Sequence, residues 1–170
     1  MTNYVALLRA VNLGKRQLRM DELRDIAGKL GLEEPRTYIA SGNLLFRSSS
    51  AELALKSMLE SAISEHMSAV VGVMIRTADE LAETTRTNVF AGKPGNLVTA
   101  IFLDHAPSAD ALEVAKNVTD ERIVLGKREI FVHYPSGQGR SRLKIPAAAA
   151  GTARNWNTVI KLAELSREKP

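Results

Sequence analysis

The alternation of apolar and polar residues in the first half of the chain predicts strands and helices in a regular order. Short β-prone runs are followed by longer segments in which apolar residues recur every three or four positions. The expected order is strand, helix, strand, strand, helix, strand, which is that of a split βαβ, or ferredoxin-like, unit. The elements are strands at Tyr4 to Val11, Arg36 to Ala40, Asn43 to Arg47 and Val70 to Arg76, and helices at Met20 to Leu30 and Leu55 to Met67.

Glycine and hydroxyl residues mark several boundaries of these elements. Gly31 follows the first helix at the left-handed position typical of a helix end, and Gly42 supplies the positive φ that a tight turn between strands needs. A capping box, in which a hydroxyl and a carboxylate three residues apart each bind the other's backbone N–H, is expected at two helix starts. The two pairs are Ser49 with Glu52, and Thr77 with Glu80.

The order of elements begins again after the turn-forming sequence Gly92-Lys93-Pro94-Gly95. The expected elements are a strand at Leu97 to Leu103, a helix at Ser108 to Lys116, a hairpin of Arg122 to Leu125 and Glu129 to Tyr134 turning through Gly126 and Lys127, a short alanine helix between Pro146 and Gly151, and a last helix carrying Trp156. No final strand is evident in this half. We therefore predict an α+β fold of two ferredoxin-like (alpha-beta plait) halves with a C-terminal helical extension, with domains at 1–86 and 97–170.

The composition predicts a soluble cytoplasmic protein. Among 170 residues, 45% are hydrophobic and 25% are charged, which is ordinary for a globular protein. The chain has no cysteine, so disulfides and thiolate metal sites are excluded. Its longest apolar run, near Ala69 to Ile75, is far shorter than the roughly 20 residues that span a bilayer. The formal charge of +4 fits an anionic partner, although surplus lysine and arginine on the surface explain it equally well.

The segment from Thr152 to Thr158 combines several hydrogen-bonding side chains with the only tryptophan of the chain. A helix start needs one or two such groups to satisfy its free N–H donors. In one interpretation Asn155 or Thr152 caps the last helix and Trp156 anchors a core. In the other, Arg154 and the N–H groups of the helix start bind a phosphate or a carboxylate. Both interpretations can hold together.

Three further polar blocks are candidates for binding. Ser136 to Lys144 is a glycine-bracketed loop that carries Arg140 and Arg142, although it matches neither a P-loop nor a dinucleotide-binding fingerprint. Arg9, near the end of a buried strand, needs a partner for its charge, and Asn12 follows it. Ser41 and Asn43 flank the glycine of the predicted turn, where they could simply bind the backbone.

Taken together, these blocks resemble an uncharacterised bacterial family, DUF 1697. The resemblance covers nearly the whole chain, and the serine-glycine-asparagine turn and the arginine-asparagine-tryptophan-asparagine run are specific when found together. It implies two alpha-beta plait domains and implies no activity. The matching segments are Leu7 to Gly14, Met20 with Leu23 and Arg24, Thr37 to Phe46, Gly139 to Leu143, and Thr152 to Leu162.

Our first functional hypothesis is an anionic ligand, either RNA or a nucleotide-like small molecule, bound where the two halves meet. The candidate ligand-binding residues are Arg9, Asn12, Ser41, Asn43, Arg140, Arg142, Arg154, Asn155 and Asn157. No cofactor or metal is expected, because the three histidines lack metal-ligand spacing. The alternatives are a small-molecule enzyme that acts on a phosphorylated or carboxylated substrate and uses Asp104 or His105 for proton transfer, and a structural or regulatory homo-oligomer without a ligand. The pattern does not decide whether the protein is an enzyme.

Overall fold

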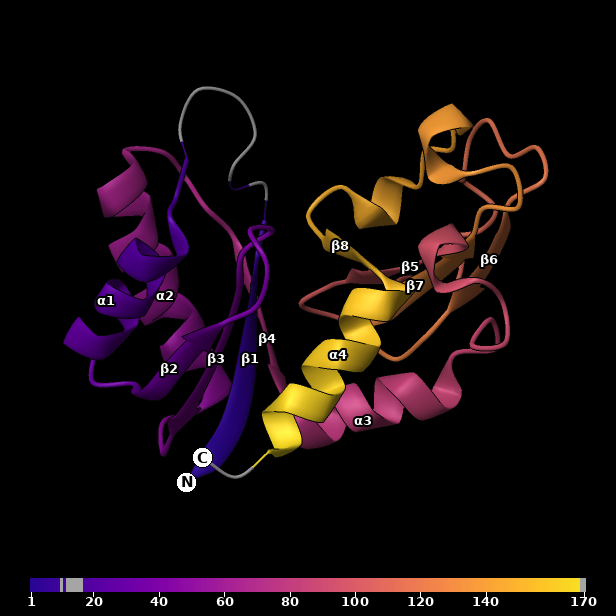
Figure 1. The fold of residues 1–170 in the computed structure, drawn as a ribbon. Coiled ribbons are helices and arrows are strands. Elements are labelled where there is room, and N and C mark those ends of the chain that lie inside the picture. Colours follow the sequence, from indigo (N-terminus) through magenta and orange to yellow (C-terminus); the bar gives the residue numbers. More distant parts are fainter. Residues whose placement is uncertain (10, 12–16, 169–170) are drawn as a thin grey trace. The chain divides into compact units, whose positions relative to one another are not determined.

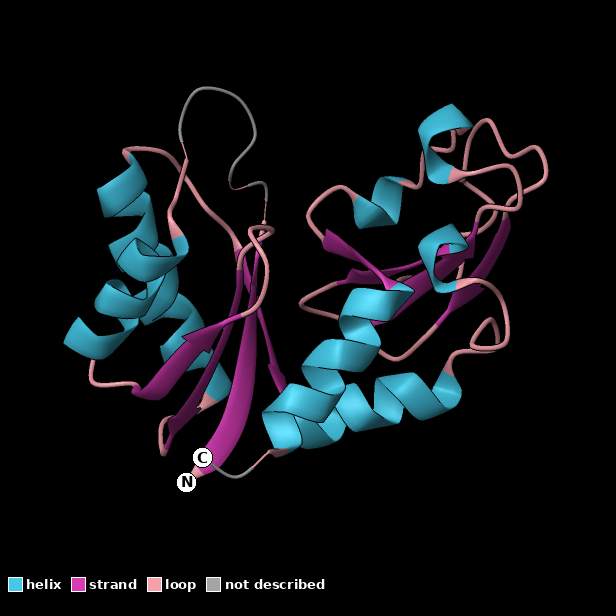
Figure 2. Cartoon of the chain, in the orientation of Figure 1, coloured by secondary structure: helices cyan, strands magenta, loops and turns pink. Residues whose placement is uncertain are grey.

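The computed structural model describes residues 1–9, 11 and 17–168. It contains two four-stranded antiparallel sheets together with helices, the last of which ends the described chain (Figures 1 and 2). The chain divides into two compact units, one formed by Met1–Leu81 with Leu162–Pro170 and the other by Ala82–Lys161. The division falls within helix α3 (Ala78–Thr87) and within helix α4 (Trp156–Arg167).

The first unit pairs its strands in the order β2-β3-β1-β4. Two helices lie on the same side of this sheet (Figure 1). The elements are β1 (Thr2–Leu8), α1 (Met20–Lys29), β2 (Glu33–Thr37), β3 (Asn43–Ser48), α2 (Glu52–Met67) and β4 (Val73–Thr77).

Alternate residues of the central strands form the core beneath these helices. Tyr4 lies opposite Phe46, and their rings stack with centroids 5.7 Å apart. The helices contribute fully buried leucines, among them Leu23, Leu55 and Leu59. Because each such side chain contributes roughly 1.5–3 kcal/mol when it leaves water, this face fixes the register of β1 against its neighbours.

Two of the predicted helix boundaries in this unit are confirmed. Gly31 has a φ of 77°, and the N–H of Leu32 donates to the carbonyl of Ala27 at 3.1 Å, which closes α1 as the glycine signal indicated. At the start of α3, the N–H of Glu80 donates to the Thr77 hydroxyl at 3.1 Å, and the N–H of Thr77 donates to the Glu80 carboxylate at 2.8 Å. That pair is a complete capping box.

Other local predictions for this unit are wrong. Helix α2 has Ala51 as its N-cap residue with no side-chain cap, so the Ser49–Glu52 box does not form. In the turn before the helix, the Ser48 hydroxyl instead accepts the N–H of Ser50 at 3.0 Å. Strand β2 begins at Glu33 and ends at Thr37, earlier than the predicted strand. Its pairing with β3 contains a register shift between Glu33 and Arg36, which the polar residues of this strand do not reveal.

The second unit pairs its strands in the order β6-β7-β5-β8. The predicted hairpin is confirmed, since Leu125 pairs with Ile130 and the N–H of Gly126 donates to the carbonyl of Glu129 at 2.8 Å. The elements are the 3₁₀ turn η1 (Gly95–Leu97), β5 (Val98–Phe102), β6 (Arg122–Leu125), β7 (Glu129–His133), the 3₁₀ turns η2 (Gln138–Arg140) and η3 (Pro146–Ala148), and β8 (Thr152–Asn155).

A fourth strand that the sequence did not reveal completes the second sheet. Strand β8 pairs with β5, from Phe102 opposite Thr152 to Thr99 opposite Asn155. Apart from Thr152, its residues have little intrinsic β preference, so pairing within the folded unit, rather than local sequence, determines their conformation. The final strand missing from the sequence prediction is therefore the polar segment that was expected to begin the last helix.

Two predicted helices of the second unit are also wrong. Ser108 to Lys116 forms turns, in which Ala111 alone is fully buried, so a helix there would gain too little packing to offset its nucleation cost. The alanine segment forms only the 3₁₀ turn η3, which begins at Pro146 as the proline signal indicated. It stops early because Gly151 must pass close to the carbonyl of Phe102 to enter β8.

Both faces of the second sheet are buried. One face carries Ile101, Ile130 and Val132, over which Ile145 packs. The opposite face carries Phe131, whose ring meets Trp156 edge-on with centroids 6.3 Å apart. Among the described residues, no helix is long and apolar enough to cross a membrane.

Candidate functional site

A basic groove lies on the second unit, where two distant segments of the chain pair. Lys116 and Lys144 form an isolated antiparallel bridge, with N–H to carbonyl distances of 2.8 and 3.0 Å. A groove of about 380 Å³ lies beside this bridge, lined by Lys116, Lys144, Ile145, Pro146, Ala148 and Ala149. Both lysines are exposed, so their ammonium groups stay in water while the rest of the lining is apolar.

The local sequence explains this shape. Ile145 is buried against the sheet and draws the chain inward, and Pro146 then turns it into η3. The alanines that follow are too small to fill the space over the apolar floor. The backbone bridge holds the two lysines on opposing segments, because residues directly opposite in an antiparallel pair carry their side chains on the same face. The result is two positive charges beside an apolar surface. We call these six residues the basic groove.

The glycine-bracketed loop before the groove is tied down by two carboxylates. Ser141 donates its hydroxyl to Glu121, which also accepts the N–H of Thr119 at 2.7 Å, and Ser136 donates to Asp120. These hydrogen bonds, the one from Ser141 first, lower the pKa of Glu121 from 4.5 to about 2. The carboxylate is therefore ionised at neutral pH and fixes the loop.

The amide groups of this loop largely serve the loop itself. The N–H of Arg140 donates to the carbonyl of Gly137, and the N–H of Ser141 donates to the carbonyl of Gln138. Arg140 and Arg142 are exposed, so their charges face solvent. Two carboxylates therefore lie beside this loop and several of its amides bind within it, and the anion-binding role suggested by its glycines stays a prediction.

The tryptophan run is placed by β8 and α4. Asn155 accepts the N–H of Thr158 at 2.9 Å and so caps α4. Arg154 is buried on the face of the sheet that carries Phe131, and it donates to the Thr152 hydroxyl at 2.8 Å and to the Ala153 carbonyl at 2.9 Å. Burial lowers its pKa to about 10.

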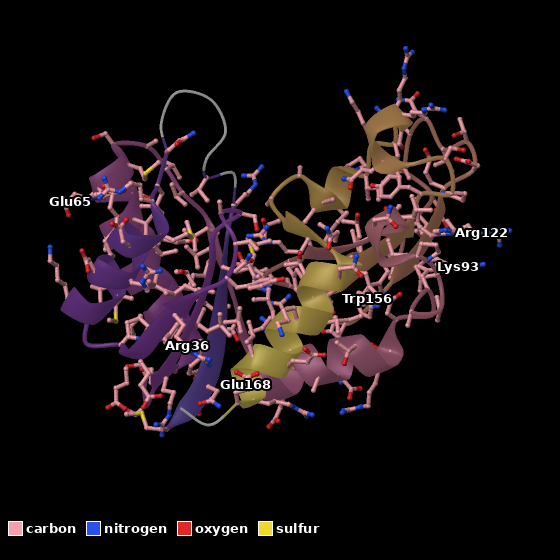
Figure 3. The ribbon with its side chains drawn as sticks, viewed as in Figure 1. Arg36, Glu65, Lys93, Arg122, Trp156 and Glu168 are labelled. Carbon is pink, nitrogen blue, oxygen red and sulfur yellow. The ribbon has the colours of Figure 1, made fainter. Side chains whose placement is uncertain are left out.

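Asn157, the second residue of α4, lies beside η1. A Cβ on Gly95 would lie 2.0 Å from Asn157 Oδ1, so only glycine allows this approach. Trp156, labelled in Figure 3, stands between these two asparagines in the sequence, and its side chain is buried. The run therefore combines a helix cap, a core anchor and a close contact with η1. The cap at Asn155 and the anchor at Trp156 were both predicted by the structural interpretation of the sequence.

The remaining sequence candidates belong to the first unit. Asn43 is buried, and its side-chain amide donates to the Tyr38 carbonyl and to the Ser41 hydroxyl, both at 2.9 Å, which holds the turn around Gly42. Arg9 is exposed, and its backbone N–H donates to the carbonyl of Gly72 at 2.8 Å. Asn12 lies outside the described residues. The prediction that these residues share one site with those of the second unit stays a prediction.

A second hollow of the second unit contains the residues considered for proton transfer. Its volume is about 270 Å³, and its lining includes Asp104, His105 and Ser108. Arg128 donates to the backbone carbonyl of Asp104 at 3.2 Å. His105 is exposed, and among the described residues no group of three or more histidine, aspartate or glutamate side chains could hold a metal ion.

The sequence did not reveal the pairing of Lys116 with Lys144. Lys116 was expected at the end of a helix and Lys144 at the end of the glycine-bracketed loop. The residues between them include the β6–β7 hairpin, and only the folded sheet brings the two segments together. No spacing within the sequence signals such a contact.

Comparison with known proteins identifies a protein family and a solved structure to which this chain is similar. The model of a family described as protein of unknown function (DUF1697) matches residues 1–131, ending within β7. The solved structure of a conserved bacterial protein from Streptococcus pneumoniae is similar over 99% of this chain and 99% of that chain, at 26% sequence identity and a TM-score of 0.83. No curated protein matches the chain in sequence.

Proposed function

We propose that this chain, which belongs to the family of proteins of unknown function DUF1697, binds an anionic small molecule in the basic groove of its second unit. The family membership confirms the resemblance inferred from the sequence motifs. The observation that carries the proposal is the pairing of Lys116 with Lys144 at the edge of an apolar groove of about 380 Å³. That volume lies in the range of small-molecule sites, which is roughly 300–1,000 Å³.

The chemistry of the groove favours a ligand with both a charged and an apolar part. An exposed ammonium–anion pair contributes only about 0.2–1 kcal/mol, so two lysines alone hold a simple anion weakly. Contact with Ile145, Pro146 and the alanines adds roughly 25 cal/mol for each Å² of apolar surface that leaves water. A carboxylate, sulfonate or phosphate attached to a small apolar body uses both contributions.

RNA is the less favoured anion for this protein. Plait domains that bind RNA stack bases on aromatic side chains of an open sheet face. Here Tyr4 and Phe46 stack on each other beneath α1 and α2 and are nearly fully buried, so they offer no such platform. This supports a small molecule.

The strand orders support the finer fold prediction as well. Each sheet places the third strand of its unit beside the first, and the second and fourth at the edges, as in a ferredoxin-like plait. We propose that both halves are plaits, the second with turns and 3₁₀ turns in place of both of its crossover helices. The domain ranges 1–86 and 97–170 remain part of this proposal.

An anionic fluorescent dye with an apolar body, anilinonaphthalene sulfonate, tests the groove. We expect the dye to bind the folded protein, and Lys116→Met and Lys144→Met each to weaken binding about two- to fivefold, the loss of one exposed charge pair. Lys127→Met is the matched control, because it removes an exposed lysine from the β6–β7 turn. Equal binding by all three variants, or equal loss in all three, would contradict the proposal.

A further inference from the structure

Two buried side-chain nitrogen atoms in the described part of the chain have no hydrogen-bond partner, Asn88 Nδ2 and His133 Nδ1. Both side chains are more than nine-tenths buried, with 4% and 8% of their surface exposed. A buried polar atom without a hydrogen-bond partner is costly, and native structures keep very few of them. Two in one unit need a physical explanation.

Phe90 connects the two residues. Its backbone N–H donates to Asn88 Oδ1 at 2.9 Å, which fixes the orientation of that amide and leaves Nδ2 as the end without a partner. Its ring lies against the His133 imidazole with centroids 5.7 Å apart. Asn88 and His133 therefore both contact Phe90, the first at its backbone N–H and the second at its ring.

Two basic residues lie near His133 and Phe90. Arg122 lies directly opposite His133 in the β6–β7 pair, so the two side chains share a face of the sheet. Lys93 follows Phe90 in the same loop, and its N–H donates to the Phe90 carbonyl at 2.9 Å. Both cations are exposed, and both are labelled in Figure 3.

We propose that Asn88 and His133 form a binding site for a small carboxylate, covered by Phe90 and distinct from the basic groove. A planar carboxylate offers two oxygen atoms, one to the Asn88 amide N–H and one to Nδ1–H of His133. Arg122 and Lys93 nearby offset the cost of bringing the charge out of water. Entry of the ligand requires the Phe90 ring to move, and the residues that follow it, 91 to 94, are exposed.

Titration with acetate, monitored through the ring signals of the three histidines by NMR, tests this site. Acetate replaces chloride at constant ionic strength, and the His133 signals are identified by their loss in His133→Phe. We expect a saturable shift of His133 alone, with no comparable shift of His66 or His105. No saturable shift, or the same shift with phosphate as with acetate, would overturn the proposal.

Two aspartate variants separate the site from general electrostatics. Asn88→Asp keeps the oxygen that accepts the Phe90 N–H but loses the donor, so we expect acetate binding at least tenfold weaker. Asn96→Asp adds the same charge at an exposed position of η1, and we expect binding within about twofold of the natural chain. Trp156 fluorescence confirms that each variant is folded. Undiminished binding by folded Asn88→Asp would show that Asn88 does not hold the ligand.

If Asn88→Asp does not fold, His133→Phe provides the second test. It preserves an aromatic ring against Phe90 and removes Nδ1. Broadening of the signal of isotope-labelled acetate measures binding without the histidine signal. We expect this broadening to be lost in His133→Phe, and its persistence would refute the site.

Discussion

The cap of helix α4 permits the sharpest prediction of stability. Asn155 accepts the N–H of Thr158 at 2.9 Å, and its own side chain is exposed, so Asn155→Ala removes the cap without opening a cavity. Loss of an N-cap costs about 0.5–2 kcal/mol of unfolding free energy. Thr158 is buried, which leaves its N–H poorly hydrated and places the expected loss in the upper half of that range, about 1–2 kcal/mol.

Asn155→Asp is the matched variant. It keeps an oxygen acceptor and adds a negative charge at the helix start, where the helix dipole contributes about 0.3–1 kcal/mol in its favour. We therefore expect Asn155→Asp to be as stable as the natural chain or slightly more stable.

Urea unfolding monitored by Trp156 fluorescence measures both changes. This residue is the only tryptophan and follows Asn155 directly, so its signal reports on the unit that contains the cap. With a urea dependence of about 1–3 kcal/mol per molar, a loss of 1 kcal/mol lowers the midpoint by about 0.3–1 M. An unchanged midpoint in Asn155→Ala would refute the capping role. If Asn155→Ala kept its midpoint but lost the binding of an anionic ligand, Asn155 would contact that ligand rather than cap the helix.

Three further predictions follow from single residues. Trp156→Ala should cost about 3–5 kcal/mol of unfolding free energy in thermal or urea melts, and Trp156→Phe clearly less, because the buried ring is anchored by edge-on packing. Because the pKa of Glu121 is lowered, its contribution to stability is complete above about pH 4.5 and is lost as the pH falls to about 2. The difference in urea midpoint between the natural chain and Glu121→Gln should therefore shrink over that pH interval. Gly42→Ala should destabilise the protein by more than about 1 kcal/mol, because φ is 86° and a Cβ would lie 2.6 Å from a neighbouring side chain. Gly28→Ala, at an exposed position of α1, should stabilise it by about 0.5–1 kcal/mol. The opposite order of stability in calorimetry would contradict the turn geometry.

Much of the first unit could be predicted because its signals are local. The apolar period of α1, the glycine after it and the capping box at Thr77 each depend on residues within a few positions of one another. Such signals survive in a single sequence. The same reasoning succeeded for the β6–β7 hairpin, where the turn glycine and two β-prone runs are adjacent.

Several features of the second unit depend on pairing between segments that lie far apart in the sequence. Strand β8 exists because β5 provides an edge for it, and nothing within its four residues announces this pairing. The bridge of Lys116 with Lys144 likewise depends on the hairpin that separates the two lysines in sequence. Polar density drew attention to the tryptophan run, where the structure shows a cap and an anchor, whereas the basic groove arises from residues that carry no local motif.

Backbone amide shifts in NMR spectra test whether the basic groove binds an anion, because they locate the bound molecule wherever it lies. On addition of anilinonaphthalene sulfonate, we expect the largest shifts at Lys116 and among the amides of residues 144–149, and we expect them to weaken in the Lys116→Met, Lys144→Met double variant. Largest shifts at residues 152–158 or within the first unit, with residues 144–149 unmoved, would contradict binding in the groove.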